Sequence, residues 1–352
     1  MSDGRFLTAY LDLPFLKKLL RSKPDRAAPP DDEWPEAWQN VYRFLQRSAR
    51  IVVDASLEDI KSERILTRFF LDSGQSSHVD PRPGVSEQYS DPDAANIDDP
   101  YSVFLFDNPE IPVDDLRQQK GLLFLRHDDL DEHWLRLFSE HVIDIQPEAS
   151  NSFSWEQLLP HSEPLNAILI ADKYAFAPFK ESEFEENIGA LLCAVLPKGP
   201  LDRRFHVTIV ADLELAFAGK RNGPPPKEPW YPGDICDFVR SFIKDCRPNL
   251  EFYLTLIGHK PRGGHKDRFL FTNYGLFTSN DSFAFFKDGE LNKETLVQYL
   301  PNSIHGKSVT VHRLQRFAEL CSSPRKAYAP RRSEAVQLAE GDFRNRLLDE
   351  LT

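Results

Sequence analysis

The hydrophobic positions in the first part of the chain alternate between short apolar runs and helical spacing. Short apolar runs predict strands at residues 5–12, 50–53, 102–106, 121–125 and 142–145. Apolar residues at helical spacing predict helices from Pro14 onward and at residues 33–47, 57–71 and 131–139. Strands that alternate with helices indicate a layered α/β domain with a parallel sheet.

The remaining residues show a second alternation of the same kind, followed by a strand-rich region. Strands are predicted at residues 167–171, 205–210, 250–257, 268–274, 276–277 and 283–286. Helices are predicted at residues 184–196, 235–246, 293–300, 311–320 and 335–348. The chain shows no internal repeat at a fixed period.

A chain of 352 residues is too long for one ordinary core, so the pattern predicts two layered α/β domains. The first is expected at residues 1–160, with an acidic surface insertion at 73–99 that has few apolar residues. The second is expected at residues 164–322, followed by a charged tail or helix at 323–352.

Composition narrows the class of protein. The net charge of −12 argues against coating nucleic acid by bulk electrostatics, although residues 259–268 and 325–332 are locally basic. The chain has no secretory signal pattern and no apolar run of membrane length, which predicts a soluble, cytoplasmic protein without membrane partners. The four cysteines are scattered without a CxxC pair, and buried thiols explain them better than disulfides or zinc.

Acidic residues follow or flank the predicted strands of the first domain. The candidate catalytic and metal-binding set is Asp12, Glu58, Asp115 and Asp128, with Asp59, Asp114 and Asp129 as neighbouring alternatives. Carboxylates gathered at the carboxyl edge of a parallel sheet can bind Mg²⁺ or Mn²⁺, which activate water and neutralise a scissile phosphate. The other interpretation is that these acids are helix caps and surface charges.

Four segments of this domain resemble the PIN-like nuclease fold. They are Y-L-D-L-P-F-L-K-K-L-L, I-V-V-D-A-S-L-E-D-I, D-D-L-R-Q-Q-K-G-L-L-F-L-R-H-D-D-L and V-I-D-I-Q-P-E. The resemblance implies a divalent-metal-dependent ribonuclease with the four acids as ligands. The chain departs from the usual pattern of this fold in three ways. Leu13 and Pro14 stand where such domains usually have hydroxyl or amide residues, the helix before the third strand is short, and the strand at 102–106 has no obvious place.

The second domain looks like the single, non-catalytic phospholipase-D-like domain of MIT-domain proteins and their bacterial relatives. The resemblance rests on L-N-A-I-L-I-A-D-K-Y-A-F, E-N-I-G-A-L-L-C-A-V-L-P, F-H-V-T-I-V-A-D and H-K-D-R-F-L-F-T-N-Y-G-L-F-T-S. The matching positions are Asp172, Tyr174, Asn187, His265, Asp267 and Arg268, with Lys266 inserted. The spacing H-x-K-x4-D that catalytic members need is missing, so this domain is not expected to cleave phosphodiesters.

Two interpretations of the polar residues in the second domain stay open. One is a structural network of Asp172, Tyr174 and Asp267, in which Arg268 pairs with Asp172. The other is a phosphate or nucleic-acid site made by Lys260, Arg262, His265, Lys266 and Arg268.

Together the two resemblances imply a nucleic-acid-acting bacterial effector. The leading hypothesis is an endoribonuclease of a toxin or anti-phage system, with RNA, not DNA, as the expected nucleic-acid partner. The alternative is a non-enzymatic subunit of a defence complex, in which both domains serve assembly with a protein partner or a second copy of the chain.

Overall fold

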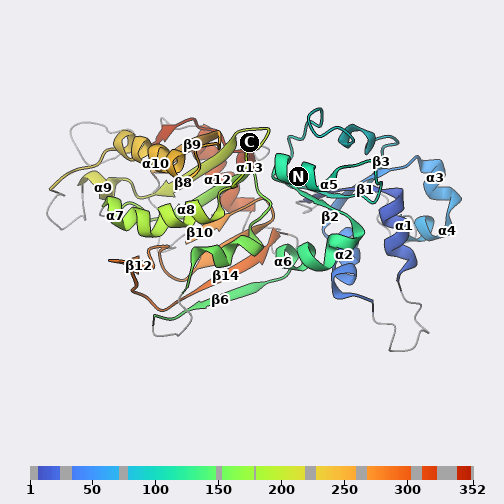
Figure 1. Cartoon of the computed structure of the whole chain (residues 1–352), viewed down its shortest axis with the longest axis horizontal. Coiled ribbons are helices and arrows are strands. Elements are labelled where there is room, and N and C mark those ends of the chain that lie inside the picture. The colour runs from blue at the N-terminus through green and yellow to red at the C-terminus, as the bar shows by residue number, and fades with distance from the viewer. Residues whose placement is uncertain are drawn as a thin grey trace. The chain divides into compact units, whose positions relative to one another are not determined.

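The computed structural model describes residues 7–23, 34–70, 78–147, 153–177, 180–218, 227–258, 268–302, 311–322 and 339–349. The chain divides into two compact units. The first comprises Met1–Ser139 with Pro301–Val309, and the second comprises Glu140–Leu300 with Thr310–Thr352. Each unit has its own sheet with helices around it, so the predicted α/β fold class is confirmed (Figure 1).

The sheet of the first unit has five parallel strands in the order β3-β2-β1-β4-β5. Its strands are β1 (Leu7–Asp12), β2 (Ala49–Asp54), β3 (Val79–Pro81), β4 (Ser102–Leu105) and β5 (Leu123–Leu125). The chain adds β2 and β3 on one side of β1, then β4 and β5 on the other. The strand without an obvious place in the sequence, β4, is therefore a central strand beside β1. The order reverses between β1 and β4, where open α/β sheets bind ligands.

Short helices connect these strands. They are α1 (Leu13–Arg21), α2 (Glu36–Arg47), α3 (Leu57–Ser62), α4 (Arg64–Phe70), η2 (Glu87–Tyr89), α5 (Val113–Lys120), η3 (His127–Asp129), η4 (Leu130–Trp134) and α6 (Leu135–Phe138). The single helix expected at 57–71 is divided into α3 and α4 because Glu63 has an extended backbone (φ −112°, ψ 118°). Ser56 and Asp59 form a capping box that fixes the start of α3.

Part of the predicted surface insertion at 73–99 belongs to the first sheet. Its strand β3 pairs with β2, and Tyr89 is buried against Phe104 with ring centroids 5.1 Å apart. The Asp54 carboxylate accepts hydrogen bonds from the Gly84 amide (2.6 Å) and the Ser86 amide (3.2 Å). A carboxylate at the end of β2 thus holds the segment that the sequence suggested was only a surface loop.

The second unit has an eight-stranded mixed sheet in the order β15-β9-β8-β7-β10-β11-β14-β6. Its strands are β6 (His141–Ile145), β7 (Ala167–Asp172), β8 (Phe205–Ala211), β9 (Phe252–Gly258), β10 (Arg268–Phe271), β11 (Gly275–Ser279), β14 (Thr295–Pro301) and β15 (Ala339–Gly341). Strands β12 (Phe286–Lys287) and β13 (Glu290–Leu291) form a separate hairpin. Three neighbouring strands of this sheet, β7, β8 and β9, are parallel.

Helices cover this sheet on both faces. They are η5 (Trp155–His161), α7 (Glu181–Phe184), η6 (Glu185–Gly189), α8 (Ala190–Val195), α9 (Glu214–Ala218), α10 (Pro232–Cys246), α12 (Val311–Ser322) and α13 (Arg346–Asp349). Figure 1 shows α7, α8 and α10 together near strands β8 and β9. One core cluster contains Ile168 of β7, Leu192 of α8 and Val239 of α10. Phe317 of α12 instead contacts Phe269 of β10, with ring centroids 5.6 Å apart.

Three element predictions in this unit are corrected. The strand β6 pairs with β14, which places the boundary between units at residue 140 instead of near residue 160. Residues 295–301 form a strand, not a helix, and Thr295, Val297 and Tyr299 are buried in the period of two that a sheet requires. The terminal helix was expected at 335–348; of this range the structure describes residues 339–348, which contain strand β15 and most of the single turn α13 instead.

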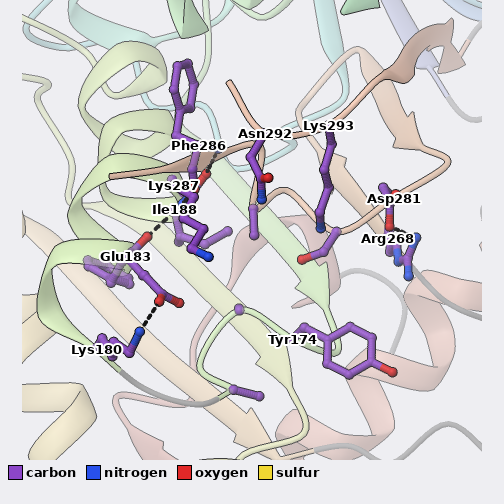
Figure 2. Close-up of a pocket in the computed structure, with 16 residues that line it drawn as sticks. Tyr174, Lys180, Glu183, Ile188, Arg268, Asp281, Phe286, Lys287, Asn292 and Lys293 are labelled. Carbon is purple, nitrogen blue, oxygen red and sulfur yellow. Dashed lines mark hydrogen bonds and ion pairs between the residues drawn. The ribbon is translucent and has the colours of Figure 1, made fainter. Parts of the chain in front are cut away.

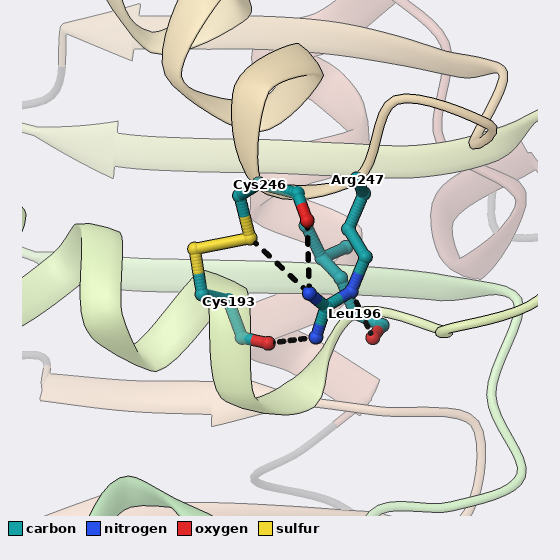
Figure 3. The surroundings of a disulfide bond; sticks show 4 residues. All are labelled: Cys193, Leu196, Cys246 and Arg247. Carbon is teal, nitrogen blue, oxygen red and sulfur yellow. Dashed lines mark hydrogen bonds between the residues drawn. A yellow bond between two sulfur atoms is a disulfide. The ribbon is translucent and has the colours of Figure 1, made fainter.

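A disulfide joins Cys193 of α8 to Cys246 at the end of α10, which corrects the prediction of four free thiols (Figure 3). The Arg247 side chain lies beside this bond and donates hydrogen bonds to the carbonyls of Leu196 (3.1 Å) and Cys246 (3.0 Å). Cys236 and Cys321 are buried thiols, as predicted, and burial raises their pKa values to about 11 and about 12. Within the residues described, no helix has the length and apolar character needed to cross a membrane.

Candidate functional site

Asp12 lies at the switch point of the first sheet, where it acts as a structural clamp. Its buried carboxylate caps α1 by accepting from the Phe15 amide, and it accepts from the amides of Asp107 and Asn108, all at 2.8 Å. It therefore ties the loop after β4 to the end of β1. Burial raises the pKa of Asp12 to about 6, against the lowering effect of these three hydrogen bonds.

Asp128 is exposed and lies beside a lysine. The Lys18 ammonium is 3.1 Å from the Asp128 carboxylate and 3.8 Å from that of Asp107. The hydrogen bond from Lys18 lowers the pKa of Asp128. The Lys18 ammonium thus lies next to the carboxylates of Asp107 and Asp128 at this edge of the sheet.

Glu58 and Asp115 are exposed in the first turns of α3 and α5, where acids favour the helix dipole. Across the described parts of the chain, no three His, Cys, Asp or Glu side chains come together as a group able to hold a metal ion. As placed, the four predicted ligands do not fit Mg²⁺ or Mn²⁺, because Asp12 is bound to amides and Asp128 to Lys18. The metal site stays a prediction.

The sequence reasoning missed Asp107 and Lys18 at this edge. Asp107 follows the apolar run at 102–106 and accepts from the His127 amide (2.8 Å), which joins the ends of β4 and β5. The clue in the sequence was that Asp107 follows the strand at 102–106, but this strand had no predicted place in the sheet.

In the second unit, Asp172 at the end of β7 organises the chain around it. Its buried carboxylate accepts from Ser282 Oγ (2.6 Å), the Phe283 amide (2.6 Å) and the Tyr174 amide (2.9 Å). Burial raises the pKa of Asp172, and these hydrogen bonds oppose that effect. Asp172 thus fixes both the turn after β7 and the segment after β11.

Arg268 is opposite Asp172 in the register of β10 and β7, yet it does not form the predicted ion pair with it. Its Nη1 donates to Asp281 Oδ1 (3.1 Å) and to the Asn280 carbonyl (2.5 Å). Arg268 is only 6% exposed, and its buried Nε has no hydrogen-bond partner within the described parts of the chain. Buried polar groups normally have partners, so this nitrogen calls for an explanation.

Arg268 lines a pocket of about 320 Å³ beside the carboxyl end of β7. Four cationic side chains line this pocket with two carboxylates, a formal net charge of +2: Lys180, Arg268, Lys287 and Lys293 against Glu183 and Asp281. Lys180 pairs with Glu183, as Arg268 does with Asp281. Figure 2 shows the side chains of Asn292 and Lys293 directed into the space between these two pairs.

The wall of the pocket is held by Asn187 of η6. Its Nδ2 donates to the carbonyls of Glu183 and Phe286 (2.9 Å each), and its Oδ1 accepts from the Phe286 amide (2.8 Å). This buried amide joins the helix wall to β12. The predicted residue Asn187 therefore positions the pocket, and its side-chain groups are already occupied.

Tyr174 lies at the margin of the pocket and is 36% exposed. Lys173 Nζ lies 5.0 Å from the centroid of its ring, over one face. The amide of Tyr174 is bound to Asp172, so the backbone is fixed while the ring remains accessible.

The structure brings together Asp172, Tyr174 and Arg268 of the predicted set. The other predicted residues, Lys260, Arg262, His265, Lys266 and Asp267, lie outside the described residues. Sequence reasoning missed Lys180, Lys287, Asn292 and Lys293, which reach the pocket from three separate segments. No motif spacing connects those segments, so only a contact map could have found them.

Comparison with known proteins adds no assignment: no protein family matches the chain, and no curated protein does.

Proposed function

We propose that the second unit binds phosphate groups of nucleic acid, RNA in particular, at the pocket beside Arg268. The observation that carries the proposal is the Arg268 guanidinium, which lines the pocket and whose buried Nε has no partner among the described residues. Arginine is suited to phosphate because its planar fork donates two parallel hydrogen bonds. Asp281 accepts a hydrogen bond from Nη1 and holds the guanidinium in place at the wall of the pocket.

The charge around the pocket supports an anionic ligand. Lys287 and Lys293 have no ion-pair partner among the residues that the structure describes, and both line the pocket. The pocket carries +2 on a chain whose net charge is −12, so the positive charge here is local. Local cations attract a phosphate although the whole protein is acidic. Binding without cleavage agrees with the absence of the H-x-K-x4-D spacing.

A labelled single-stranded RNA, titrated with the protein at several salt concentrations and followed by fluorescence anisotropy, tests this function. The double variant Lys287→Ala/Lys293→Ala is expected to bind at least about 10-fold more weakly, with a smaller salt dependence. The matched control is Lys227→Ala/Lys244→Ala, which removes the same charge from exposed lysines elsewhere in the second unit. Equal losses in both variants, or no binding by the unaltered protein, would overturn the proposal.

The metal-dependent endoribonuclease predicted for the first unit is a second candidate, which would give the chain its effector activity. One observation favours it: Asp107 follows β4 at the switch point of a parallel sheet, where open α/β sheets bind ligands. RNA cleavage with Mg²⁺ or Mn²⁺ tests it. Under this candidate Asp107→Asn loses cleavage at least about 100-fold and the exposed control Asp131→Asn does not. No cleavage by the unaltered protein would exclude it.

A further inference from the structure

The pocket has the size of one nucleotide. A volume of about 320 Å³ is at the lower end of small-molecule sites, and it suits a single ligand unit better than a length of backbone. Its walls come from the turn after β7, from α7 and η6, and from the segment after β11, so three sides are protein. Such a site favours the end of a strand, or a free nucleotide, over a phosphate inside a continuous strand.

The charge of the pocket also favours a terminal phosphate. A phosphomonoester carries about −1.5 to −2 at neutral pH, whereas a phosphodiester carries one negative charge. The net charge of +2 matches the former. Glu183 and Asp281 already pair with Lys180 and Arg268, so the excess positive charge comes from Lys287 and Lys293, which have no ion-pair partner in the described ranges.

Tyr174 offers the other half of a nucleotide site. Because Lys173 lies over one face of its ring, a base can stack only on the opposite face. Its exposed fraction of 36% is high for an aromatic ring in this unit, where most aromatic residues are buried in the core. An accessible ring next to cationic side chains is the usual arrangement by which proteins bind a base and its phosphate together.

We propose that the pocket binds a nucleotide with a terminal phosphate, the phosphate against Arg268, Lys287 and Lys293 and the base stacked on Tyr174. This inference rests on the proposed phosphate-binding function and adds its ligand class: the phosphorylated end of an RNA strand, or a free nucleoside monophosphate. The Asn292 amide, which points into the pocket, is placed to donate to the ligand (Figure 2).

Competition against a labelled 5′-phosphorylated RNA tests the inference. RNAs of one sequence with a 5′-phosphate, a 3′-phosphate or two hydroxyl ends are compared, followed by AMP and ribose 5-phosphate as competitors. A phosphorylated end is expected to bind at least about 10-fold more tightly than hydroxyl ends, and AMP to compete at least about 10-fold better than ribose 5-phosphate. Tyr174→Ala should remove the advantage of AMP, and Tyr174→Phe should keep it.

The outcomes separate this inference from the proposed function. Equal binding of all three RNAs, still weakened in Lys287→Ala/Lys293→Ala, would overturn the inference and leave phosphate binding intact. Equal competition by AMP and ribose 5-phosphate would show a phosphate site without base stacking and would also overturn it. If the lysine variant binds every RNA as the unaltered protein does, both proposals fail.

Discussion

Ser282 and Asp172 are 110 residues apart in the chain, yet Ser282 Oγ donates a 2.6 Å hydrogen bond to Asp172 Oδ2. The same carboxylate oxygen accepts from the Phe283 amide, also at 2.6 Å. One buried carboxylate at the end of β7 therefore fixes the segment that forms a wall of the candidate pocket.

Replacing Asp172 should destabilise the second unit. The substitution Asp172→Ala leaves three donors without their acceptor in a buried place, so the free energy of unfolding is expected to fall by about 3 kcal/mol. Urea unfolding followed by circular dichroism measures it. Glu294→Ala, an exposed acid in the same unit, serves as the control and should change the value by less than about 0.5 kcal/mol. A loss as small as that for Asp172→Ala would contradict the assigned role.

The free energy of unfolding of the first unit should decrease as the pH rises, because of Asp12. Its pKa is about 6 in the folded state and 3.8 ordinarily, so between these values the folded state holds a proton that the unfolded state has released. The free energy of unfolding therefore decreases as pH rises from about 4 to about 6, by up to about 3 kcal/mol, and the contribution stays lost above that. Carbon NMR titration of the Asp12 carboxyl measures the midpoint directly. A midpoint below about 4 would refute the assignment, and Asp12→Asn should lack the decrease.

Reduction of the disulfide should loosen α8 from α10. The bond between Cys193 and Cys246 spans 53 residues, and closing a loop of this length contributes about 2–4 kcal/mol to stability. Urea unfolding with and without dithiothreitol measures the difference. The variant Cys193→Ser/Cys246→Ser is expected to be insensitive to the reductant. Alkylation of the denatured, unreduced protein should label two thiols, and labelling of four would disprove the bond.

The segment at 339–349 should be required for the second unit to be stable. Asn345 is buried, and its Nδ2 donates to the Ile168 carbonyl and to Thr208 Oγ1, both at 2.9 Å. Asn345→Ala is expected to lower the free energy of unfolding by about 2–3 kcal/mol, since buried partners are left unpaired. Glu340→Ala, at an exposed position of the same segment, is the comparison. If both variants unfold at the same urea concentration, the segment does not secure the sheet.

Strongly patterned segments were predicted well, and segments whose pattern depends on their neighbours were not. The parallel strands β7, β8 and β9 are continuous apolar runs, as is typical of buried parallel strands, and the sequence located all three. A helix was expected at residues 293–300, but pairing with β6 makes residues 295–301 a strand. Neither β6 nor β15 shows from its own residues which sheet it will join.

In the candidate site, too, some residues could be predicted from the sequence, whereas their contacts could not. The residues Asp172, Tyr174 and Arg268 stand out in the sequence because they lie at strand ends, and the structure places them around one pocket or its edge. The partner of Arg268 was predicted as Asp172, its neighbour in the sheet, but is Asp281, in the segment after β11. Loop conformation decides which carboxylate reaches a guanidinium, and that conformation depends on contacts such as Ser282 to Asp172.

The sequence by itself determined that this protein is α/β, where its strongest strands lie, and that several polar residues stand at strand ends. Those properties follow from the local periodicity of apolar residues, which can be recognised within a short stretch of sequence. Only the tertiary structure decided that Lys18 lies against Asp107 and Asp128, that Asp12 is enclosed by amides, and that Lys287 and Lys293 line one pocket with a buried arginine. These are contacts between distant segments, and long-range packing sets them.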